Sequence, residues 1–342
     1  MQLRFGSLDD WLERATYRYA CDLPVFSLTY AAGRVLEIRP FLAVCQDVLI
    51  IGGDWIPAYS DGLALIEQMV HTPSQYLEKA INIKLVNGHY TLETQPVEAL
   101  DEDVVLIGGR DNYYHWLIDF LPRLILAEKV VGERKLIVNQ DLAAYQLESL
   151  KALGYEPSDL LPLGDRQVVR PRSTLVPSLL ASTTVPHKAL PGLLRAAFPA
   201  TKSSGCDRVY LSRQDAATRK LSNEDALIAL LERHGFTTFR TEKMSFEDQR
   251  NLFHNAKAVV AVHGAGMANI LFCPSGTHVF EIFSPALKVT SMYLISMFCR
   301  HHHEFVPARN LTFGANGNPL LGTWEVDLDA MAVALKKTLG AT

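Results

Sequence analysis

The second half of the chain alternates between short apolar runs and segments in which apolar and polar residues recur at helical spacing. The runs predict four strands, at 208–211, 236–239, 258–262 and 277–283. The segments between them predict helices at 222–234 and 245–255, and Ser-x-x-Asp capping boxes at Ser222 and Ser245 mark both helix starts. Alternation of strands and helices is typical of a parallel sheet.

The first half has a similar pattern after a run of short apolar segments. Strands are expected at 41–45, 48–51, 103–107 and 135–138, and helices at 112–131 and 141–153, the second ending at Gly154. A hairpin is expected around residues 84–89. We therefore predict a largely parallel sheet in this half as well.

Five prolines and many Ser and Thr residues lie between about 170 and 206, a composition typical of a linker or domain crossing. At 342 residues the chain is long enough for two domains. We place them at 1–190 and 191–342, and we expect two α/β domains with a cleft between them.

Composition and charge narrow the class of protein. An apolar fraction of 48% and a charged fraction of 20% are those of a globular protein, and a net charge of −4 gives no reason to expect nucleic acid as a partner. The N-terminus lacks the apolar run of a signal peptide, and the run at 289–299 is too short to span a bilayer and predicts a buried helix. Five scattered cysteines favour reduced thiols and a cytoplasmic location.

The strongest chemical signal is the loop after the strand at 258–262, which reads His263-Gly-Ala-Gly266 and continues to Asn269. Glycines let a ligand approach the backbone, and the free amides at a helix start attract anions. Arg213 and Arg219 follow the strand at 208–211 and are expected at the same sheet edge, where they would clamp a diphosphate. The alternative is that both arginines are surface residues paired with Asp215 and Glu224.

Three further residues have both a structural and a functional interpretation. Glu281 is a lone acid in an apolar strand, and a ribose diol is favoured as its partner over a structural one. Asn223 and Glu224 begin a helix, which capping explains well enough.

His115 and Asp119 are four residues apart at the start of the helix expected from Asn112. A carboxylate one turn away fixes the tautomer of a histidine and raises its basicity, as a general base requires, although a lone histidine near a helix start is more often structural. Tyr113 and Trp116 would pack against a sugar or fill the core.

Other motifs carry less weight. His301-His302-His303 is similar to a metal tract, but neighbouring residues of a strand point to opposite faces and no matching acid cluster accompanies it. We expect metal-independent chemistry, unlike that of the single-domain sugar transferases whose usual metal-binding signature is a DxD motif.

Together these blocks resemble the family-61 glycosyltransferases over about residues 110–285. The resemblance is carried by three segments: Asn112-Tyr-Tyr-His-Trp-Leu-Ile-Asp119 with Pro122-Arg123; Tyr210-Leu-Ser-Arg213 through Arg219 and Asn223-Glu224; and Glu242 through Phe246 and Gln249 to His263-Gly-Ala-Gly266, Asn269 and Glu281.

The resemblance implies a GT-B-like fold, in which two Rossmann-like domains face a central cleft, with the acceptor on the first and the nucleotide sugar on the second. It implies inverting transfer of a sugar from a nucleotide sugar, with a UDP-sugar favoured and no metal or cofactor required. On this chain Arg213, Arg219, His263, Gly264, Ala265, Gly266, Asn269 and Glu281 would bind the donor, and His115 with Asp119 would supply the base.

The expected acceptor is a glycan or a lipid-linked saccharide used in surface polysaccharide synthesis. This would place the enzyme in the cytoplasm, with peripheral association at the inner membrane face. Two alternatives stay open at this point: a transferase of another group, such as a pyruvyl transferase, and a non-catalytic glycan-binding subunit of the same fold. The sequence does not indicate the sugar, the linkage or the oligomeric state.

Overall fold

A computed structural model of the chain describes residues 1–5, 7–29, 35–65, 80–93, 97–182, 185–202, 206–287, 289–314 and 317–340. The chain divides into two compact units, Met1–Leu193 (unit 1) and Leu194–Thr342 (unit 2). The roles predicted for the two domains, acceptor-side and donor-side, stay a prediction.

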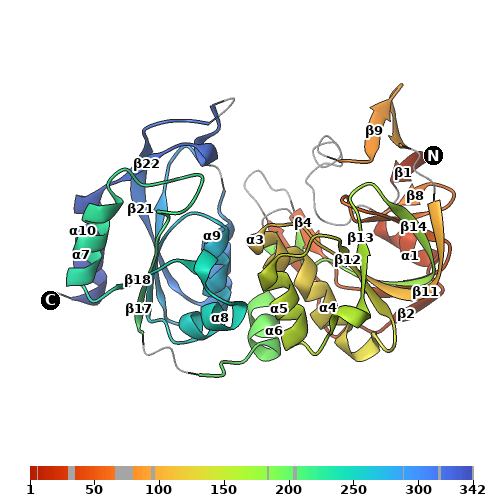
Figure 1. Cartoon of the computed structure of the whole chain (residues 1–342), viewed down its shortest axis with the longest axis horizontal. Coiled ribbons are helices and arrows are strands. Elements are labelled where there is room, and N and C mark those ends of the chain that lie inside the picture. Colours follow the sequence, from red (N-terminus) through yellow and green to blue (C-terminus); the bar gives the residue numbers. More distant parts are fainter. Residues whose placement is uncertain are drawn as a thin grey trace. The chain divides into compact units, whose positions relative to one another are not determined.

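Unit 2 contains a six-stranded sheet in the order β18-β17-β19-β20-β21-β22, in which all neighbours are parallel except the edge strand β22. Helices α7 and α10 cover one face, and α8 and α9 cover the other (Figure 1). The strands are β17 (Arg208–Leu211), β18 (Thr237–Phe239), β19 (Ala258–Val262), β20 (His278–Phe283), β21 (His302–Asn310) and β22 (Trp324–Val326). The helices are α7 (Glu224–Arg233), α8 (Phe246–His254), α9 (Ser291–Cys299) and α10 (Leu328–Leu339).

The strand order creates a natural ligand position in unit 2. Taken in chain order, the five parallel strands lie as 2-1-3-4-5, so the direction of winding reverses between β17 and β19. In such sheets the loops on either side of the reversal diverge and leave a crevice at the carboxyl ends of the strands. The segments that follow β17 and β19 are the ones predicted to bind a diphosphate.

The core of unit 2 explains why these strands form. Val260, Phe280 and Trp324 are fully or almost fully buried from the sheet, and Leu227 of α7 and Leu335 of α10 pack against them. Continuous apolar runs are typical of parallel strands covered on both faces. The strands expected at 208–211 and 258–262 are confirmed with the same bounds.

Unit 1 combines four parallel strands with a larger antiparallel region. Twelve of its described strands form one sheet whose main path is β13-β12-β11-β14-β6-β7-β8-β1-β10-β9, with β5 beside β14 and β2 beside β5. The strands are β1 (Gln2–Phe5), β2 (Tyr17–Tyr19), β5 (Leu42–Cys45), β6 (Val48–Ile51), β7 (Ile56–Tyr59), β8 (Leu63–Ala64), β9 (Ile83–Val86), β10 (His89–Leu92), β11 (Val97–Gly108), β12 (Lys135–Asn139), β13 (Leu160–Leu163) and β14 (Val168–Pro177).

The prediction of a largely parallel sheet in the first half is therefore wrong, because only β11 to β14 form a continuous parallel set. The early strands are joined by tight turns, and short connections can join only antiparallel neighbours. Gly53 and Trp55 have positive φ in the turn between β6 and β7, which pair antiparallel. The expected hairpin at 84–89 is confirmed by the pairing of β9 with β10.

The boundary between the two units falls within the proline-rich stretch at 170–206, as a domain crossing requires, but most of the stretch is regular structure and not a linker. Most of its first part belongs to β14, which pairs with β11 in the middle of the sheet. It continues through the short strands β15 (Ala181–Ser182) and β16 (Val185–Pro186) into α6 (Leu190–Ala197). Burial of the apolar residues of β14 outweighs the weak strand preference of its prolines.

Helical segments of unit 1 follow the predicted positions with altered geometry. The helix expected at 112–131 consists of α3 (Tyr113–His115), a π-helical segment (Trp116–Phe120), α4 (Leu121–Ala127) and a 3₁₀ turn (Glu128–Val130). Helix α5 (Ala144–Ala152) is slightly shorter than predicted, and α1 (Leu8–Glu13) and the small hairpin of β3 (Phe26–Thr29) with β4 (Val35–Ile38) complete the unit.

The two predicted capping boxes have different outcomes. Ser245 caps α8 by accepting from the backbone N–H of Asp248 at 3.0 Å, as expected. Ser222 does not cap α7, whose N-cap is Asn223. The Asn223 side chain exchanges two hydrogen bonds with the backbone of Val326 instead, so it ties the start of α7 to β22.

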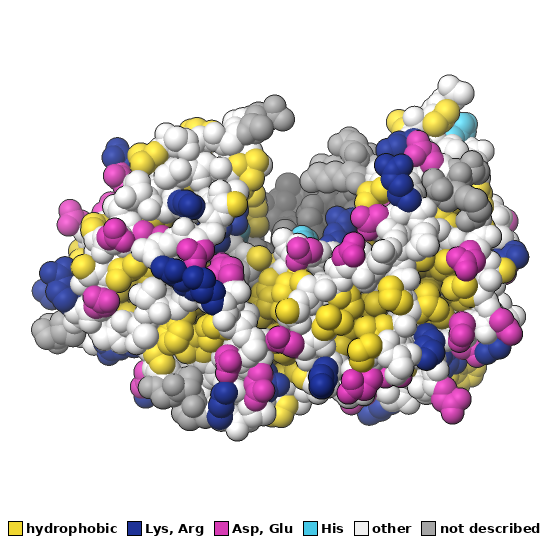
Figure 2. All heavy atoms as spheres, viewed as in Figure 1, with side chains coloured by type: hydrophobic (Ala, Val, Ile, Leu, Met, Phe, Trp, Pro, Cys, Tyr) yellow, Lys and Arg dark blue, Asp and Glu magenta, His cyan; other side chains and the backbone are white. Residues whose placement is uncertain are grey.

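The surface shows no concentration of one charge on the face drawn in Figure 2, where basic and acidic side chains are interspersed. Within the described residues, no helix has the length and apolar character needed to cross a bilayer.

Two positions of α10 test this description of the unit 2 core. We expect Leu335→Ala to lower the free energy of unfolding by about 2–5 kcal/mol, because Leu335 is fully buried and its removal leaves a cavity. Val333 on the same helix is 67% exposed, and Val333→Ala should change stability by less than about 0.5 kcal/mol. Urea denaturation followed by circular dichroism measures both, and equal effects would contradict the assigned core.

Candidate anion-binding site

Arg213 is held at the carboxyl end of β17 by its own backbone and by its side chain. Its backbone N–H donates to the Glu224 carboxylate at 2.8 Å, and the same oxygen accepts from the Tyr210 hydroxyl at 2.8 Å. The guanidinium donates through Nε and Nη2 to the carbonyl of Thr218, at 3.2 and 2.7 Å. These bonds leave Nη1 directed toward Gly264, the residue at the start of the loop after β19.

Arg219 approaches the same place from the segment between β17 and α7. It has a left-handed backbone (φ 53°), its N–H donates to the carbonyl of Gly322 at 2.9 Å, and its Nη1 donates to the carbonyl of Leu320 at 3.2 Å. Burial, with a contribution from the charge of Arg213, lowers the pKa of Arg219 to about 10. Burial also lowers the pKa of Arg213.

Gly264 lies between the two guanidinium groups. A Cβ at this position would be 2.9 Å from Arg213 Nη1 and 3.3 Å from Arg219 Nη2. The Gly264 backbone is extended (φ 170°), so the glycine is required for space and not for its conformation. The absence of a side chain allows both cations to meet the backbone of the loop.

Within the described residues, neither arginine forms an ion pair with a carboxylate, so the alternative of surface pairs with Asp215 and Glu224 is wrong. Asp215 pairs with Arg240 and Lys243, both at 3.0 Å. Glu224 accepts from a hydroxyl and a backbone amide instead of a guanidinium. The charges of Glu224 and Glu242 act on Arg213 without an ion pair to it. Two half-buried cations therefore meet without a direct carboxylate contact to either guanidinium among the described residues, an arrangement that favours an anionic ligand.

The loop after β19 differs in one respect from the prediction. Residues Ala265–Phe272 form a 3₁₀-helix with Gly264 as its N-cap, where the sequence indicated an ordinary helix. The first amides of a 3₁₀-helix also lack partners inside the helix, so the expected donors at 264–266 keep their role in the prediction. Asn269 is fully buried and donates to Gln249 at 2.8 Å and to the Gly266 carbonyl at 3.2 Å, which fixes the shape of this turn.

Glu281 lies behind this loop, on β20, in a buried chain of hydrogen bonds. One carboxylate oxygen is 2.5 Å from Nδ1 of His263, and the other is 3.0 Å from Nε2 of His303. Burial raises the pKa of the Glu281 carboxyl, but the two histidine hydrogen bonds outweigh it and leave the pKa below its usual value. The ribose contact predicted for Glu281 stays a prediction, and in this structure its carboxylate has two imidazole partners.

His303 is the residue that the sequence did not identify as part of the site. It lies in the tract 301–303, which was considered only as a metal site, and among the described residues no cluster of three or more His, Cys, Asp or Glu side chains is arranged to hold a metal ion. The contact follows from register, which the sequence alone does not reveal: β20 and β21 are parallel neighbours, with Val279 opposite His303 and Glu281 opposite Phe305. Side chains two residues apart share a face, which brings His303 to Glu281.

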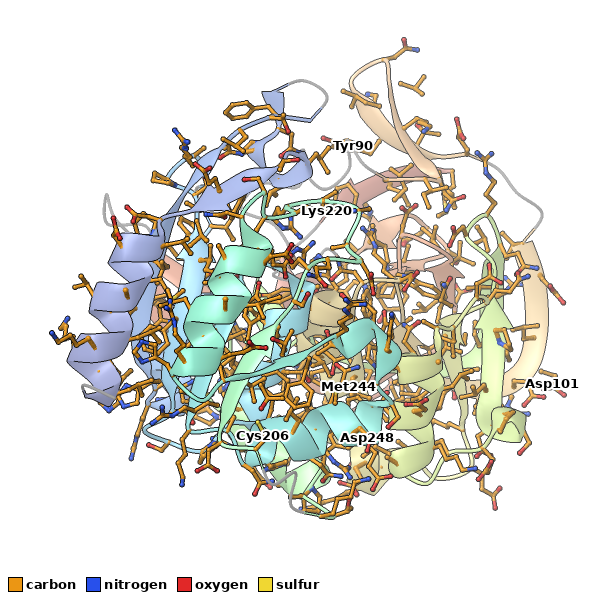
Figure 3. The ribbon with its side chains drawn as sticks, turned by 60° about the vertical axis from the view of Figure 1, so that its left-hand side comes forward. Tyr90, Asp101, Cys206, Lys220, Met244 and Asp248 are labelled. Atoms are coloured by element: carbon orange, nitrogen blue, oxygen red, sulfur yellow. The ribbon has the colours of Figure 1, made fainter. Side chains whose placement is uncertain are left out.

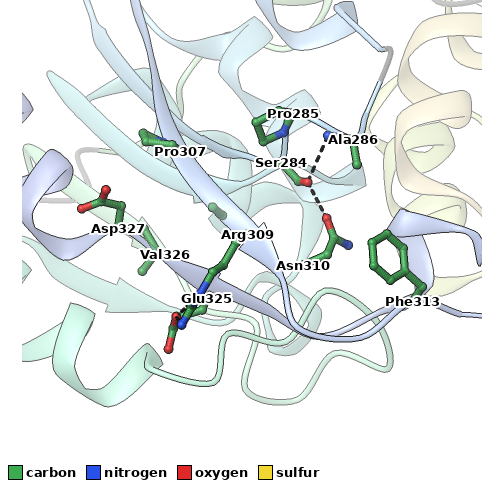
Figure 4. Close-up of a pocket in the computed structure, with 11 residues that line it drawn as sticks. Ser284, Pro285, Ala286, Pro307, Arg309, Asn310, Phe313, Glu325, Val326 and Asp327 are labelled. Atoms are coloured by element: carbon green, nitrogen blue, oxygen red, sulfur yellow. Dashed lines mark hydrogen bonds and ion pairs between the residues drawn. The ribbon is translucent and has the colours of Figure 1, made fainter.

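A pocket of about 550 Å³ lies at the carboxyl ends of β20 and β21 (Figure 4). Ser284 and Asn310 line it and hydrogen-bond to each other, and Phe313, which is 55% exposed, lies at its rim. Asn310 also donates to the carbonyl of Pro319. The next residue, Leu320, has the carbonyl that accepts from Arg219. The segments that follow β17 and β18 leave the same sheet; Figure 3 labels Lys220 in the first and Met244 in the second.

Unit 1 contains the other predicted group, His115 with Asp119. Asn112 caps the helix start by accepting from the His115 N–H at 3.2 Å, and Nδ1 of His115 is 2.7 Å from the Asp119 carboxylate. The side chain of Asp119 is 7% exposed and that of His115 is 43% exposed. The pair follows β11, whose neighbours β12 and β14 are parallel to it, so it lies at the carboxyl edge of the parallel strands.

The aromatic residues beside His115 have separate roles. Trp116 is fully buried, with its indole N–H donating to Ser149 at 2.8 Å, so it belongs to the core. Tyr113 is half-buried and packs edge-to-face on Tyr145, with ring centroids 5.1 Å apart.

The fold and the two groups define an α/β protein with a candidate anion site at the sheet edge of one unit and a histidine–carboxylate pair in the other. Residues 113–280 match the model of the family described as Glycosyltransferase 61. Over these residues the chain is similar to this family.

Curated relatives match over a shorter stretch. An EGF domain-specific O-linked N-acetylglucosamine transferase from Drosophila melanogaster is 32% identical over 78 residues, and one from Mus musculus is 28% identical over 82 residues. Each match covers 22% of this chain, and the matched segments span only 15% and 16% of the relatives' own length.

Among solved structures, the iron-containing dodecameric glycosyltransferase TibC from enterotoxigenic E. coli is 11% identical to this chain and covers 77% of it and 78% of its own length. The TM-score of 0.31 is too low to define a shared fold. A second TibC structure, in complex with ADP-D-beta-D-heptose, has the same identity and coverage and a TM-score of 0.28.

The space at Gly264 yields a direct test of the anion site. We expect Gly264→Ala to weaken the binding of inorganic pyrophosphate at least about tenfold, because the new methyl group displaces both guanidinium groups. Gly192→Ala is the matched control, since a Cβ there has no neighbour within 4 Å. Titration calorimetry measures both variants, and undiminished affinity in Gly264→Ala would place the anion elsewhere.

Proposed function

We propose that this protein is an inverting, metal-independent glycosyltransferase that moves a sugar from a nucleoside diphosphate sugar to a glycan or lipid-linked acceptor. The favoured donor is a UDP-sugar. In this proposal the two units correspond to the acceptor and donor domains of a GT-B enzyme. The similarity of residues 113–280 to the glycosyltransferase 61 family supports the class of reaction. The sugar, linkage and biological setting in surface polysaccharide synthesis rest on the family resemblance alone.

The observation that carries the proposal is the pair of guanidinium groups at Gly264 without an acidic partner among the described residues. A diphosphate supplies the missing negative charge and enough oxygens for both arginine forks and the loop amides. In sugar transfer the same groups stabilise the leaving diphosphate, because its charge increases as the bond to the anomeric carbon breaks. The pocket at Ser284 and Asn310 lies at the same sheet edge and would receive the nucleoside.

Inversion requires one base and one displacement. His115 would take the proton of the acceptor hydroxyl through Nε2, because Asp119 accepts from Nδ1 and so leaves Nε2 with its lone pair. The acceptor oxygen then attacks the anomeric carbon from the face opposite the diphosphate. The new C–O bond forms as the bond to phosphate breaks, and the electron pair leaves on the diphosphate held by Arg213 and Arg219.

Arg213→Ala tests the donor side of this proposal. We expect UDP binding to fall at least about tenfold, because one charge-assisted clamp is lost, and we expect EDTA to leave wild-type binding unchanged. Arg208→Ala is the matched control at the amino end of the same strand, where Arg208 donates to the His234 carbonyl. Calorimetry decides the point: wild-type affinity in Arg213→Ala would refute the diphosphate assignment, and loss of binding with EDTA would refute metal independence.

His115→Ala tests the base. We expect UDP binding to persist while the turnover of sugar transfer falls at least about 100-fold, the usual contribution of general base catalysis. His89→Ala, in the exposed hairpin of β9 and β10, is the control. Mass spectrometry of the product measures transfer and identifies a hexose, pentose or N-acetylhexosamine increment. Full turnover in His115→Ala would show that His115 is not the base. A product mass increased by a pyruvyl group would show that the protein transfers pyruvate and not a sugar.

A further inference from the structure

The turn between β6 and β7 holds a tryptophan in a backbone conformation that bulky residues rarely adopt. Trp55 has a φ of 57°, and Gly53 in the same turn has a φ of 72°. The left-handed region suits glycine but strains a large side chain, and such strain persists only where the surrounding structure fixes it. Because strained backbone is concentrated at functional sites, the contacts of Trp55 indicate its role.

Hydrogen bonds from two sources fix this turn. The Trp55 N–H donates to the carbonyl of Ile51 at 2.7 Å, which closes the turn. The fully buried carboxylate of Asp54 accepts from the backbone N–H groups of Ile81 and Asn82, at 2.8 and 2.9 Å. The backbone at residue 55 therefore has little freedom, and the direction of its side chain is fixed with it.

The Trp55 side chain lies against the two glycines at the end of β11. Trp55 is 3% exposed, and its indole N–H donates to the carbonyl of Gly109 at 2.6 Å. A Cβ on Gly108, which has a φ of 85°, would lie 3.0 Å from Cγ of Trp55 and 3.1 Å from Cδ1 of Phe120. Two rings therefore meet Gly108, and its lack of a side chain makes room for both.

These contacts enclose the segment that carries the proposed base. Gly109 lies six residues before His115, and Phe120 directly follows Asp119. Asp119 and Phe120 belong to the π-helical segment, a rare geometry that is frequent at functional sites. Trp55 thus contacts the chain before the pair through a hydrogen bond, and it shares a glycine with the ring that follows the pair.

Two further side chains hold the loop after β11, at longer distances. The carbonyl of Arg110 accepts from Gln146 at 3.4 Å, and the carboxylate of Asp111 accepts from the Tyr145 hydroxyl at 3.2 Å. Both donors lie on α5. The bond from Trp55 is shorter than either and comes from the opposite part of the sheet, so it is the stronger restraint on the path of the loop.

We propose that Trp55 is a positioning residue for the pair of His115 and Asp119, and that the strained turn serves to hold it there. This inference rests on the proposed function, in which His115 takes the proton of the acceptor hydroxyl. The indole restrains the loop before the pair, and its ring packs with that of Phe120 at Gly108. Both restraints keep the Asp119 carboxylate 2.7 Å from Nδ1 of His115, the geometry on which proton transfer depends.

Trp55→Phe tests this role, because it keeps an aromatic ring in the core and removes the indole N–H. We expect kcat for sugar transfer to fall at least about tenfold with KM for the donor unchanged, since a displaced base slows the chemical step alone. Trp11→Phe is the matched control. Trp11 is fully buried in the same unit, and its indole N–H has no hydrogen-bond partner among the described residues, so this variant should keep the wild-type kcat.

Nitrogen-15 spectra of the histidine rings add a readout that a loss of core packing does not change. The signals missing from His115→Ala assign the His115 ring. We expect the wild type to carry its proton on Nδ1, where Asp119 accepts it, and Trp55→Phe to show a mixture of both tautomers. Trp11→Phe should give the wild-type signals.

Three results overturn the inference. The first is wild-type kcat in Trp55→Phe, and the second is an equal loss of kcat in Trp11→Phe, which would reflect the core as a whole. The third is a fall in kcat with unchanged His115 signals, since the effect would then not pass through the pair. If the wild type transfers no sugar, the proposed function fails, while the His115 signals still decide whether Trp55 positions the pair.

Gly108→Ala decides the point if Trp55→Phe fails to fold. Its Cβ would displace the ring of Trp55, so we expect the same change in the His115 signals. Gly154→Ala is the control, because Gly154 has a similar φ of 88° and a Cβ there would have no neighbour within 4 Å. Identical His115 signals in the two glycine variants would overturn the inference.

Discussion

The meeting of two arginine side chains at a glycine is the constraint on which the rest of the site depends. Arg213 and Arg219 are half-buried, repel each other, and have no carboxylate partner among the described residues. Repulsion between two like charges destabilises the folded chain unless other interactions hold the two side chains in place. Here the carbonyls of Thr218, Leu320 and Gly322 hold the two arginines, so backbone dipoles fix both residues without neutralising them. The fold therefore presents two guanidinium groups that have no ion pair with a carboxylate among the described residues.

The sheet topology explains why these two groups lie at one place. Because the winding of unit 2 reverses between β17 and β19, the two following loops separate and leave their backbone and side chains accessible at the carboxyl edge. The parallel strands also bring residues from distant parts of the sequence side by side. Glu281 and His303 are 22 residues apart in the chain and 3.0 Å apart in space, since their strands are neighbours.

The sequence predicted that Arg213 and His263 follow neighbouring strands at one sheet edge, because the signals for these strands are local. Apolar runs end at Arg213 and at His263, and the rule that ligands bind at the carboxyl ends of strands was enough to bring them together. The strand directions of the first half were harder to predict, because apolar runs such as those at 42–51 have the same pattern in parallel and antiparallel sheets. The tight turns between these strands decide that they are antiparallel. Partners such as His303 for Glu281 depend on register between strands, which a single sequence does not encode in a visible pattern.

A crystal structure of the protein with UDP tests the central claim most directly. The account predicts that the two phosphates lie between the guanidinium groups of Arg213 and Arg219, against the backbone of 264–266, and without a metal ion between phosphate and protein. A diphosphate bound at any other place on the chain, with the two arginines unoccupied, would contradict it.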